Sequence, residues 1–266
     1  MTRSASLGFR LVDPATRRVV PDGWIVEAVP EGSTTRPVYA RRNPSGIQVF
    51  GRLPGLAAYE LGDPDARNAD GSARSEVRRT YVVRVRDRED RYLPFRWNVE
   101  VPHSGIHGID PTGFPTFAAA LPPELATLGP FVPVFSSPQR TLPAGMAAIR
   151  ADLAVGDEET PASWAWVRAT VSAGANGPRV VVDGVADARG GVLLAFPLPE
   201  PEDSLPTSVL DTGAPFGGRG WNVRLQVRYL GVGANSDAPD LNALLAQAEA
   251  APATIADGTA SPADRL

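Results

Sequence analysis

Short runs of alternating apolar and polar residues, separated by glycine and proline, constrain the fold of this chain more than any other feature. The 266 residues include 26 Gly and 27 Pro, and both are spread along the sequence. Successive side chains of a β-strand point to opposite faces, so each alternating run can offer one apolar face to a core. Frequent turn residues between short runs of this kind predict an all-β fold.

The clearest alternating runs are predicted to be strands. They cover residues 7–11, 24–28, 81–85, 97–101, 147–153, 163–171, 180–182, 192–196 and 221–229. The last run is the cleanest, and Arg224 and Arg228 on its polar side would protect it at a sheet edge. Residues 43–46 (Asn-Pro-Ser-Gly) form a good turn sequence, because proline fixes φ and glycine accepts positive φ.

The length favours two domains rather than one. We expect an N-terminal β-sandwich at 1–108, a Pro/Gly-rich linker at 109–130, a second β-sandwich at 131–232 and a helix-prone tail at 233–266. Within the tail, Ala- and Leu-rich residues 241–251 predict one short helix with Asp240 as its N-cap. The rest of the tail is small and polar, and we expect it to be loose unless a partner holds it.

Composition excludes several function classes. A formal net charge of −4 gives no general attraction to nucleic acid or to an anionic membrane. The absence of cysteine excludes disulfides, zinc fingers, iron–sulfur clusters and thiol catalysis. The start of the chain lacks the apolar run of a signal peptide, and no stretch is long enough for a transmembrane helix. We therefore expect a cytoplasmic protein.

The sequence holds no motif typical of a catalytic site. Its two histidines, His103 and His107, lie in a Gly- and Pro-containing segment that argues against the helix of a zinc protease. A loop pair with Asp110 could still bind a metal, but an ordinary pair of loop histidines is the favoured interpretation. Neither a Gly-x-Ser-x-Gly elbow nor a phosphate-binding or dinucleotide motif is present. We expect no enzymatic activity, no cofactor and no bound metal.

Both β regions resemble transthyretin-like modules of the carboxypeptidase regulatory-like type. In the first region the resemblance rests on residues 8–31 and on SGIQVFGRLPGLAAYEL at 45–61. In the second it rests on residues 147–153, 164–171 and 184–201, where Asp187-x-x-Gly190 precedes a buried strand as a turn. The resemblance implies two transthyretin-like or immunoglobulin-like sandwiches.

Three segments together resemble an accessory protein of contractile injection systems, which are phage-tail-like particles. These segments are DREDRYLPFRWNVEVP at 87–102, PVFSSPQRTLPAGMAAIRADL at 133–153 and ADARGGVLLAFPLPEP at 186–201. The resemblance covers residues 6–230 and implies a structural component of the baseplate or tail. It implies docking onto baseplate, sheath or tube proteins, in multiple copies within a symmetric assembly, with no catalytic residues. It also implies that the protein is either cytoplasmic or part of a particle released from the cell.

Two groups of residues are candidates for partner binding. Residues 91–95 combine types that are common in interfaces, and they form either an exposed corner or a β-turn with Leu93 and Phe95 buried. The members of this group are Arg91, Tyr92, Leu93, Pro94 and Phe95. The second group is the apolar side of the tail helix, which could order on a neighbour's groove. Its members are Leu241, Leu244 and Leu245.

A carbohydrate-binding or cell-surface recognition module is the alternative function. The chain has five tryptophans, which could form a platform on which sugar rings stack. Four of them lie in alternating runs that explain them as core residues. Trp164 is the remaining candidate, because the side on which it faces is ambiguous.

Overall fold

A computed structural model describes residues 5–60, 78–103, 105–108, 129–156, 160–173, 179–197, 221–231, 236–248 and 251–253. Most of the described chain is β-strand, arranged in several sheets whose pairings are mainly antiparallel. The prediction of an all-β fold is therefore confirmed. Neither described helix is long and apolar enough to cross a membrane.

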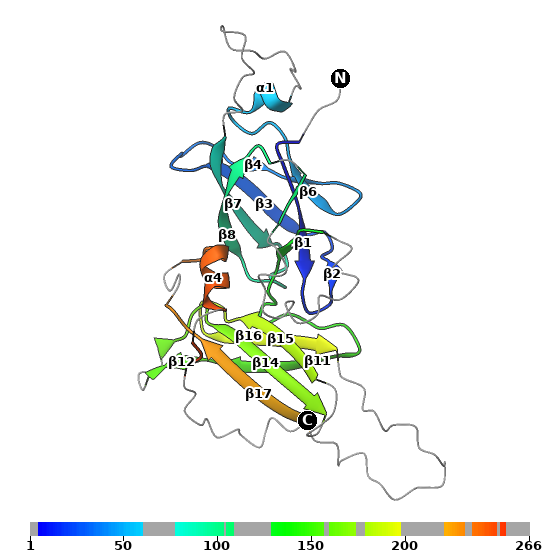
Figure 1. The fold of residues 1–266 in the computed structure, drawn as a ribbon, viewed down its shortest axis with the longest axis vertical. Helices are drawn as coiled ribbons and strands as arrows, with labels where there is room; N and C mark the ends of the chain where they lie inside the picture. The colour runs from blue at the N-terminus through cyan, green and yellow to red at the C-terminus, as the bar shows by residue number, and fades with distance from the viewer. Residues whose placement is uncertain are drawn as a thin grey trace, which may run out of the picture.

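Two sheets form the first of two units, drawn in the upper half of Figure 1. Their strands are β1 (Leu7–Asp13), β2 (Arg18–Val19), β3 (Trp24–Pro30), β4 (Val38–Tyr39), β5 (Arg41–Arg42), β6 (Ile47–Phe50), β7 (Arg79–Asp87), β8 (Phe95–Val101), β9 (Ile106–His107) and β10 (Val132–Pro133). One sheet has the order β10-β1-β6-β5, with β2 and β9 also paired to β1, and the other has the order β4-β3-β7-β8. A short helix, α1 (Ala57–Glu60), follows β6.

The core of the first unit is built from the apolar sides of the predicted strands. In β8, buried and exposed residues alternate without a break, as the period-2 pattern requires. Phe9 of β1 meets Trp97 of β8 edge to face, with ring centroids 5.1 Å apart, so the two sheets contact each other directly. Phe9, Phe50 and Tyr81 are fully buried in this core.

The second unit is smaller. Its strands are β11 (Met146–Asp152), β12 (Ala154–Val155), β13 (Thr160–Pro161), β14 (Trp166–Ala173), β15 (Arg179–Val185), β16 (Gly191–Pro197) and β17 (Trp221–Arg228). They form a sheet of order β15-β14-β17 and the pairs β11-β16 and β12-β13. A separate core joins them, with Val167 and Ala169 of β14 packed with Leu194 of β16. The predicted strand at 221–229 does lie at a sheet edge.

Two backbone features set the ends of the strands in this unit. The run predicted to begin at residue 163 becomes a strand only at Trp166, because Trp164 has a φ of 64°. The predicted turn at 187–190 is present: the Gly190 N–H donates to the Asp187 carbonyl, at 3.1 Å. Gly190 has a φ of 84°, and a Cβ there would lie 2.3 Å from the Leu153 carbonyl oxygen. Only glycine fits this turn.

A shared core connects the two units. The main hydrophobic cluster runs from Leu7 of the first unit to Phe135, Trp166 and Val185. β10 pairs in parallel with β1, so residues 132–133, which were expected in the second sandwich, lie in a sheet of the first unit. Apart from its last two residues, the expected linker at 109–130 lies outside the described residues, as do residues 61–77 and 254–266.

The predicted tail helix is present as α4 (Leu241–Gln247), and Figure 1 shows it between the two units. Asp240 caps it as predicted, accepting a hydrogen bond from the Ala243 N–H. Its Leu241 and Leu244 are buried in the main cluster. The Gln247 side chain donates to the Trp164 carbonyl and accepts from the Leu230 N–H, so α4 ties the first unit to the second.

Candidate functional site

The predicted corner at 91–95 lies between the two units. Leu93 donates its N–H to the Phe135 carbonyl, and Ser137 donates its N–H to the Arg91 carbonyl, both at 2.9 Å. Tyr92, Leu93 and Phe95 are all buried. The interpretation as an exposed corner is therefore wrong for these three residues, which face the chain's own core. We call this contact, together with the charge pair described next, the joint.

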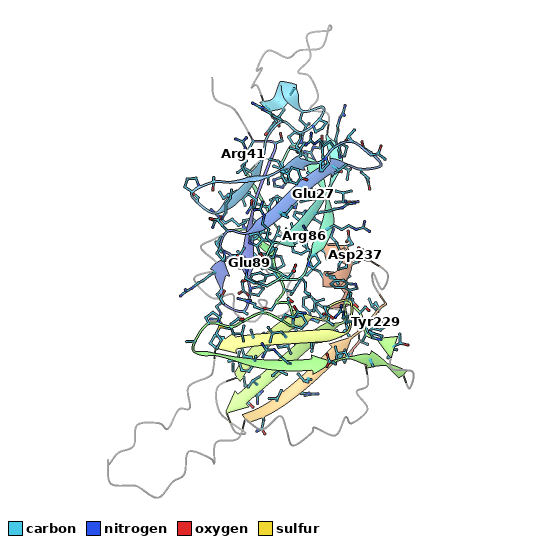
Figure 2. All side chains as sticks on the ribbon, turned by 180° about the vertical axis from the view of Figure 1, so that it is seen from behind. Glu27, Arg41, Arg86, Glu89, Tyr229 and Asp237 are labelled. Carbon is cyan, nitrogen blue, oxygen red and sulfur yellow. The ribbon has the colours of Figure 1, made fainter. Side chains whose placement is uncertain are left out.

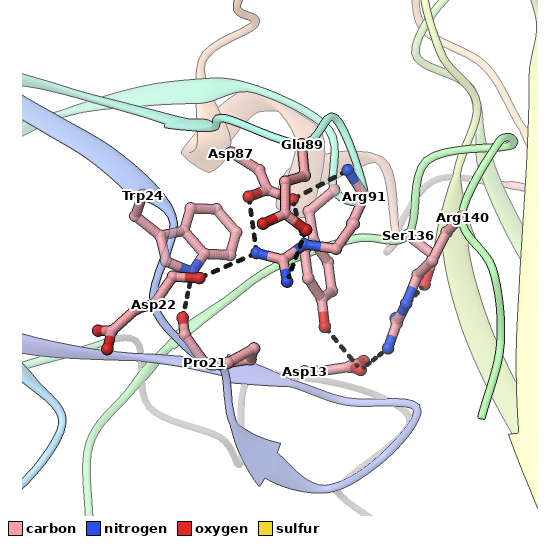
Figure 3. A network of polar contacts seen from close by, with 10 residues as sticks. Asp13, Pro21, Asp22, Trp24, Asp87, Glu89, Arg91, Ser136 and Arg140 are labelled. Atoms are coloured by element: carbon pink, nitrogen blue, oxygen red, sulfur yellow. Dashed lines mark hydrogen bonds and ion pairs between the residues drawn. The ribbon is translucent and has the colours of Figure 1, made fainter.

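A buried ion pair closes the joint (Figure 3). Arg140 lies 2.6 Å from Asp13 of β1, and the two side chains are only 6% and 2% exposed. The Arg140 guanidinium also donates to Ser136 Oγ and lies 4.4 Å from the centre of the Tyr92 ring. The Tyr92 hydroxyl donates to the same Asp13 carboxylate. Because every charge has a partner, this network fixes the connection between β10 and β11, which leads into the second unit, against β1 and Tyr92.

Arg91, the polar member of the predicted corner, is also engaged within the chain. It pairs with Asp87 at 2.8 Å and with Glu89 at 3.3 Å, and it donates to the Asp22 carbonyl. Burial alone would raise the pKa of Asp87, but hydrogen bonds from the Arg91 side chain and backbone outweigh burial and hold that pKa below its ordinary value. Figure 3 shows this second network beside the ion pair of Arg140.

The tail residues and Trp164 are buried in the same region. Leu241 is 0% and Leu244 2% exposed, and Leu245 packs against the same cluster. The groove expected on a neighbouring protein is thus supplied by this chain. Trp164 is 2% exposed, so its ring cannot stack on a sugar, and the argument that Trp164 supplies a glycan platform fails.

One face of the β4-β3-β7-β8 sheet is exposed. Pairing places Tyr39, Glu27, Arg84 and Arg96 in one row across all four strands. Arg86 occupies the same side two residues beyond Arg84, because side chains alternate along a strand. We call these five residues the outer face; Figure 2 labels Glu27 and Arg86 on their strands.

The outer face is electropositive. Glu27 pairs with Arg84 at 3.6 Å, which leaves Arg86 and Arg96 outside every ion pair found within the described residues. The Tyr39 ring is 57% exposed beside them. A chain whose formal net charge is −4 therefore presents one flat surface of opposite sign.

A polar pocket of about 390 Å³ lies at the end of the first unit, and we call it the histidine pocket. Its lining comes from α1, from the residue before β7, from β8, from the β8–β9 connection and from β9. The lining residues are Tyr59, Arg78, Asn98, Val99, Glu100, Pro102, His103 and His107. The neighbouring Glu60 fixes α1, because its buried carboxylate accepts hydrogen bonds from the Ser6 hydroxyl and from the Arg52 and Leu53 N–H groups.

Both histidines that the sequence singled out meet in this pocket. Their ring centroids are 4.9 Å apart and the rings are nearly perpendicular. The His107 ring stacks on Trp97, with centroids 6.4 Å apart. Burial and the nearby His103 lower the pKa of His107 to about 4, so this imidazole is neutral at pH 7. Nδ1 of His103 is buried and has no hydrogen-bond partner within the part of the chain that the structure describes.

The sequence revealed the histidines but not the rest of the pocket. Tyr59 and Arg78 carry no local signal, since only the fold brings them to the β8–β9 connection. Among the described residues, no group of three or more His, Asp and Glu side chains is placed to hold a metal ion. Asp110, which the sequence suggested as a third ligand, lies outside the described residues.

Comparisons of the chain with models of protein families, with curated protein sequences and with solved structures find no match.

Proposed function

We propose that this protein is a structural component of a contractile injection system or a related phage-tail-like particle. In this proposal each unit is a transthyretin-like sandwich, and the protein docks through its outer face onto a baseplate, sheath or tube protein. Segments 87–102, 133–153 and 186–201 resemble accessory proteins of such particles, and this resemblance supports a role in one of them. The protein acts there by binding, without catalysis.

The composition of the outer face is the observation that carries the docking proposal. Tyrosine and arginine are enriched among the residues that contribute most to protein–protein binding. Tyr39, Arg86 and Arg96 are exposed on one sheet. Guanidinium groups that have no ion-pair partner among the described residues can form bidentate hydrogen bonds with carboxylates of another protein.

The charge of the outer face indicates the kind of surface that it binds. Complementary charge speeds association and disfavours wrong partners. Because Arg86 and Arg96 have no acidic partner within the described residues, we propose an acidic patch on the particle protein.

The joint supports the same function. A body whose two units are already fixed loses little conformational freedom when it docks, so more of the contact energy appears as affinity. The buried Arg140–Asp13 pair and the packing of α4 fix the units in this way.

Charge reversal tests the proposal. Tagged Arg86→Glu/Arg96→Glu protein is used to capture partners from cells that produce such particles, and the partners are quantified by mass spectrometry. We expect at least tenfold less particle protein than with the wild type. Arg189→Glu is the matched control, because Arg189 is an exposed arginine of the turn before β16, away from the outer face.

Two results would contradict the proposal. Equal recovery of particle proteins by the reversed variant would reject the outer face as the docking surface. Failure of the wild-type protein to recover any particle protein from such cells would reject the role in the particle.

A further inference from the structure

The two histidines of the pocket are held in place by the backbone of β1 and of the segment before it. The His103 N–H donates to the Ser6 carbonyl at 3.0 Å. His107 lies in β9, where it pairs with Phe9 of β1, and its ring stacks on Trp97. Because these backbone contacts already hold the two rings next to each other, the pair is preorganised.

The spacing of the rings matches that of two imidazoles that share one metal ion. Imidazole nitrogen binds Zn²⁺ at about 2.0–2.1 Å, and a roughly tetrahedral angle at the metal then places the ring centres about 5 Å apart. The observed separation of the ring centroids is 4.9 Å. The same value also falls within the range of ordinary edge-to-face ring packing, so the separation permits a shared ion, and the unpartnered nitrogen described next is what argues for one.

One nitrogen of the pair is also available to a ligand. Among the described residues, the buried Nδ1 of His103 has no hydrogen-bond partner, and such an atom costs free energy unless a ligand fills the position.

We propose that His103 and His107 together bind one divalent transition-metal ion of the class that prefers imidazole: Zn²⁺, Cu²⁺ or Ni²⁺. Mg²⁺ and Ca²⁺ prefer oxygen ligands and are not expected to bind. Two protein ligands leave the other coordination positions to water or to an outside ligand. Glu100 and Arg78 line the same pocket and pair with each other at 3.7 Å, so the carboxylate balances the charge of the guanidinium there. This site is separate from the outer face and does not depend on the docking function.

Copper binding to the full chain, prepared without a polyhistidine tag, tests the proposal. The chain has two histidines and no cysteine, so imidazole-dependent binding can arise only at His103 and His107. Cu²⁺ is titrated calorimetrically and by tryptophan fluorescence, which a bound ion next to His107 should quench through Trp97. We expect one saturable ion per chain, displaced by Zn²⁺ and unaffected by excess Mg²⁺.

Variants assign the site. His103→Ala and His107→Ala should each weaken Cu²⁺ binding at least tenfold, and Asn98→Ala, in the same pocket, should leave it unchanged. Wild-type affinity in both histidine variants, or no saturable binding to the wild type, would overturn the proposal.

A second measurement needs no variant, because His107→Ala removes a ring that packs on Trp97. Zn²⁺ is added to the wild-type protein while the two imidazole signals are followed by NMR. Both signals should change together and be complete at one equivalent. A change in one signal only, or in neither, would contradict a shared ion.

Discussion

The joint and the histidine pocket both keep polar side chains away from water. At the joint, the Arg140 guanidinium meets the Asp13 carboxylate, the Ser136 hydroxyl and the Tyr92 ring. In the histidine pocket, Nδ1 of His103 has no hydrogen-bond partner among the described residues, and a hollow of about 390 Å³ lies beside the ring. Both places lie in or beside the first unit, and they differ in whether the chain itself completes the interactions.

This difference in hydrogen-bond partners indicates which place stabilises the fold and which place can bind a ligand. A buried polar group with all its partners fixes one arrangement of the chain, whereas one without a partner costs stability that a ligand can restore. The joint therefore accounts for how the two units hold together. The histidine pocket is where binding of a small ligand is to be expected.

The largest predicted effect comes from a substitution that breaks the ion pair of the joint. Arg140→Ala leaves Asp13 buried beside Tyr92 without its opposite charge, and removing one partner of a buried ion pair costs about 3–5 kcal/mol. Urea unfolding measures the loss. Arg189→Ala, at an exposed turn, should stay within about 0.5 kcal/mol of the wild type. A loss below about 1 kcal/mol at Arg140 would show that the pair does not hold the units together.

A smaller effect is predicted at the helix that bridges the units. Leu244 is 2% exposed, and truncating a buried leucine to alanine costs about 2–5 kcal/mol. The exposed Asn242 of α4 provides the control, since Asn242→Ala should change the free energy of unfolding by about 0.5 kcal/mol or less. A Leu244→Ala variant as stable as the wild type would mean that α4 is not held by this chain and is free for a partner.

The smallest predicted effect is on the pH dependence of the free energy of unfolding, which differs between the histidine pocket and the joint. His107 has a folded pKa of about 4 against an ordinary 6.5, so the unfolded chain binds more protons between these values. Its contribution to stability is complete above pH 6.5 and is lost as the pH falls towards 4. The slope is at most about 1.4 kcal/mol per pH unit, reduced by solvent because the ring is only partly buried.

Wild type and His107→Phe are compared by their denaturant midpoints from pH 7 to 4, with the slope rather than the absolute stability as the readout. The variant should lose the acid-dependent decline in this range. Asp87 at the joint has a lowered pKa, so its contribution is lost only below its ordinary value of 3.8. Identical slopes in the two proteins would contradict the assignment to His107.

The sequence predicted much of the local structure of this chain. Alternating or buried runs located the strands of seven to nine residues, whereas two-residue strands such as β2, β9 and β10 were not predicted. Turn and cap residues located Gly190 and Asp240. These features depend on a few neighbouring residues, which is why they can be found without knowledge of the fold.

The partners of apolar segments could not be predicted in the same way. Tyr92 and Leu244 have the composition of a docking surface, and they are buried against distant parts of the same chain. Apolar side chains give the same signal in both cases. The outer face was missed because it requires the register of four strands, and the pocket because Tyr59 and Arg78 approach the histidines only in the folded chain.

Site-directed photocrosslinking tests the docking account most directly. The chain has no cysteine, so Arg86→Cys creates a single attachment point for a photocrosslinker in the middle of the outer face, and Arg189→Cys does the same at a control position. Each labelled protein is illuminated in cells that assemble contractile particles. The account predicts that the label at position 86 captures one particle protein through an acidic segment, and that the label at position 189 does not. Equal capture from both positions, or capture from position 189 alone, would contradict it.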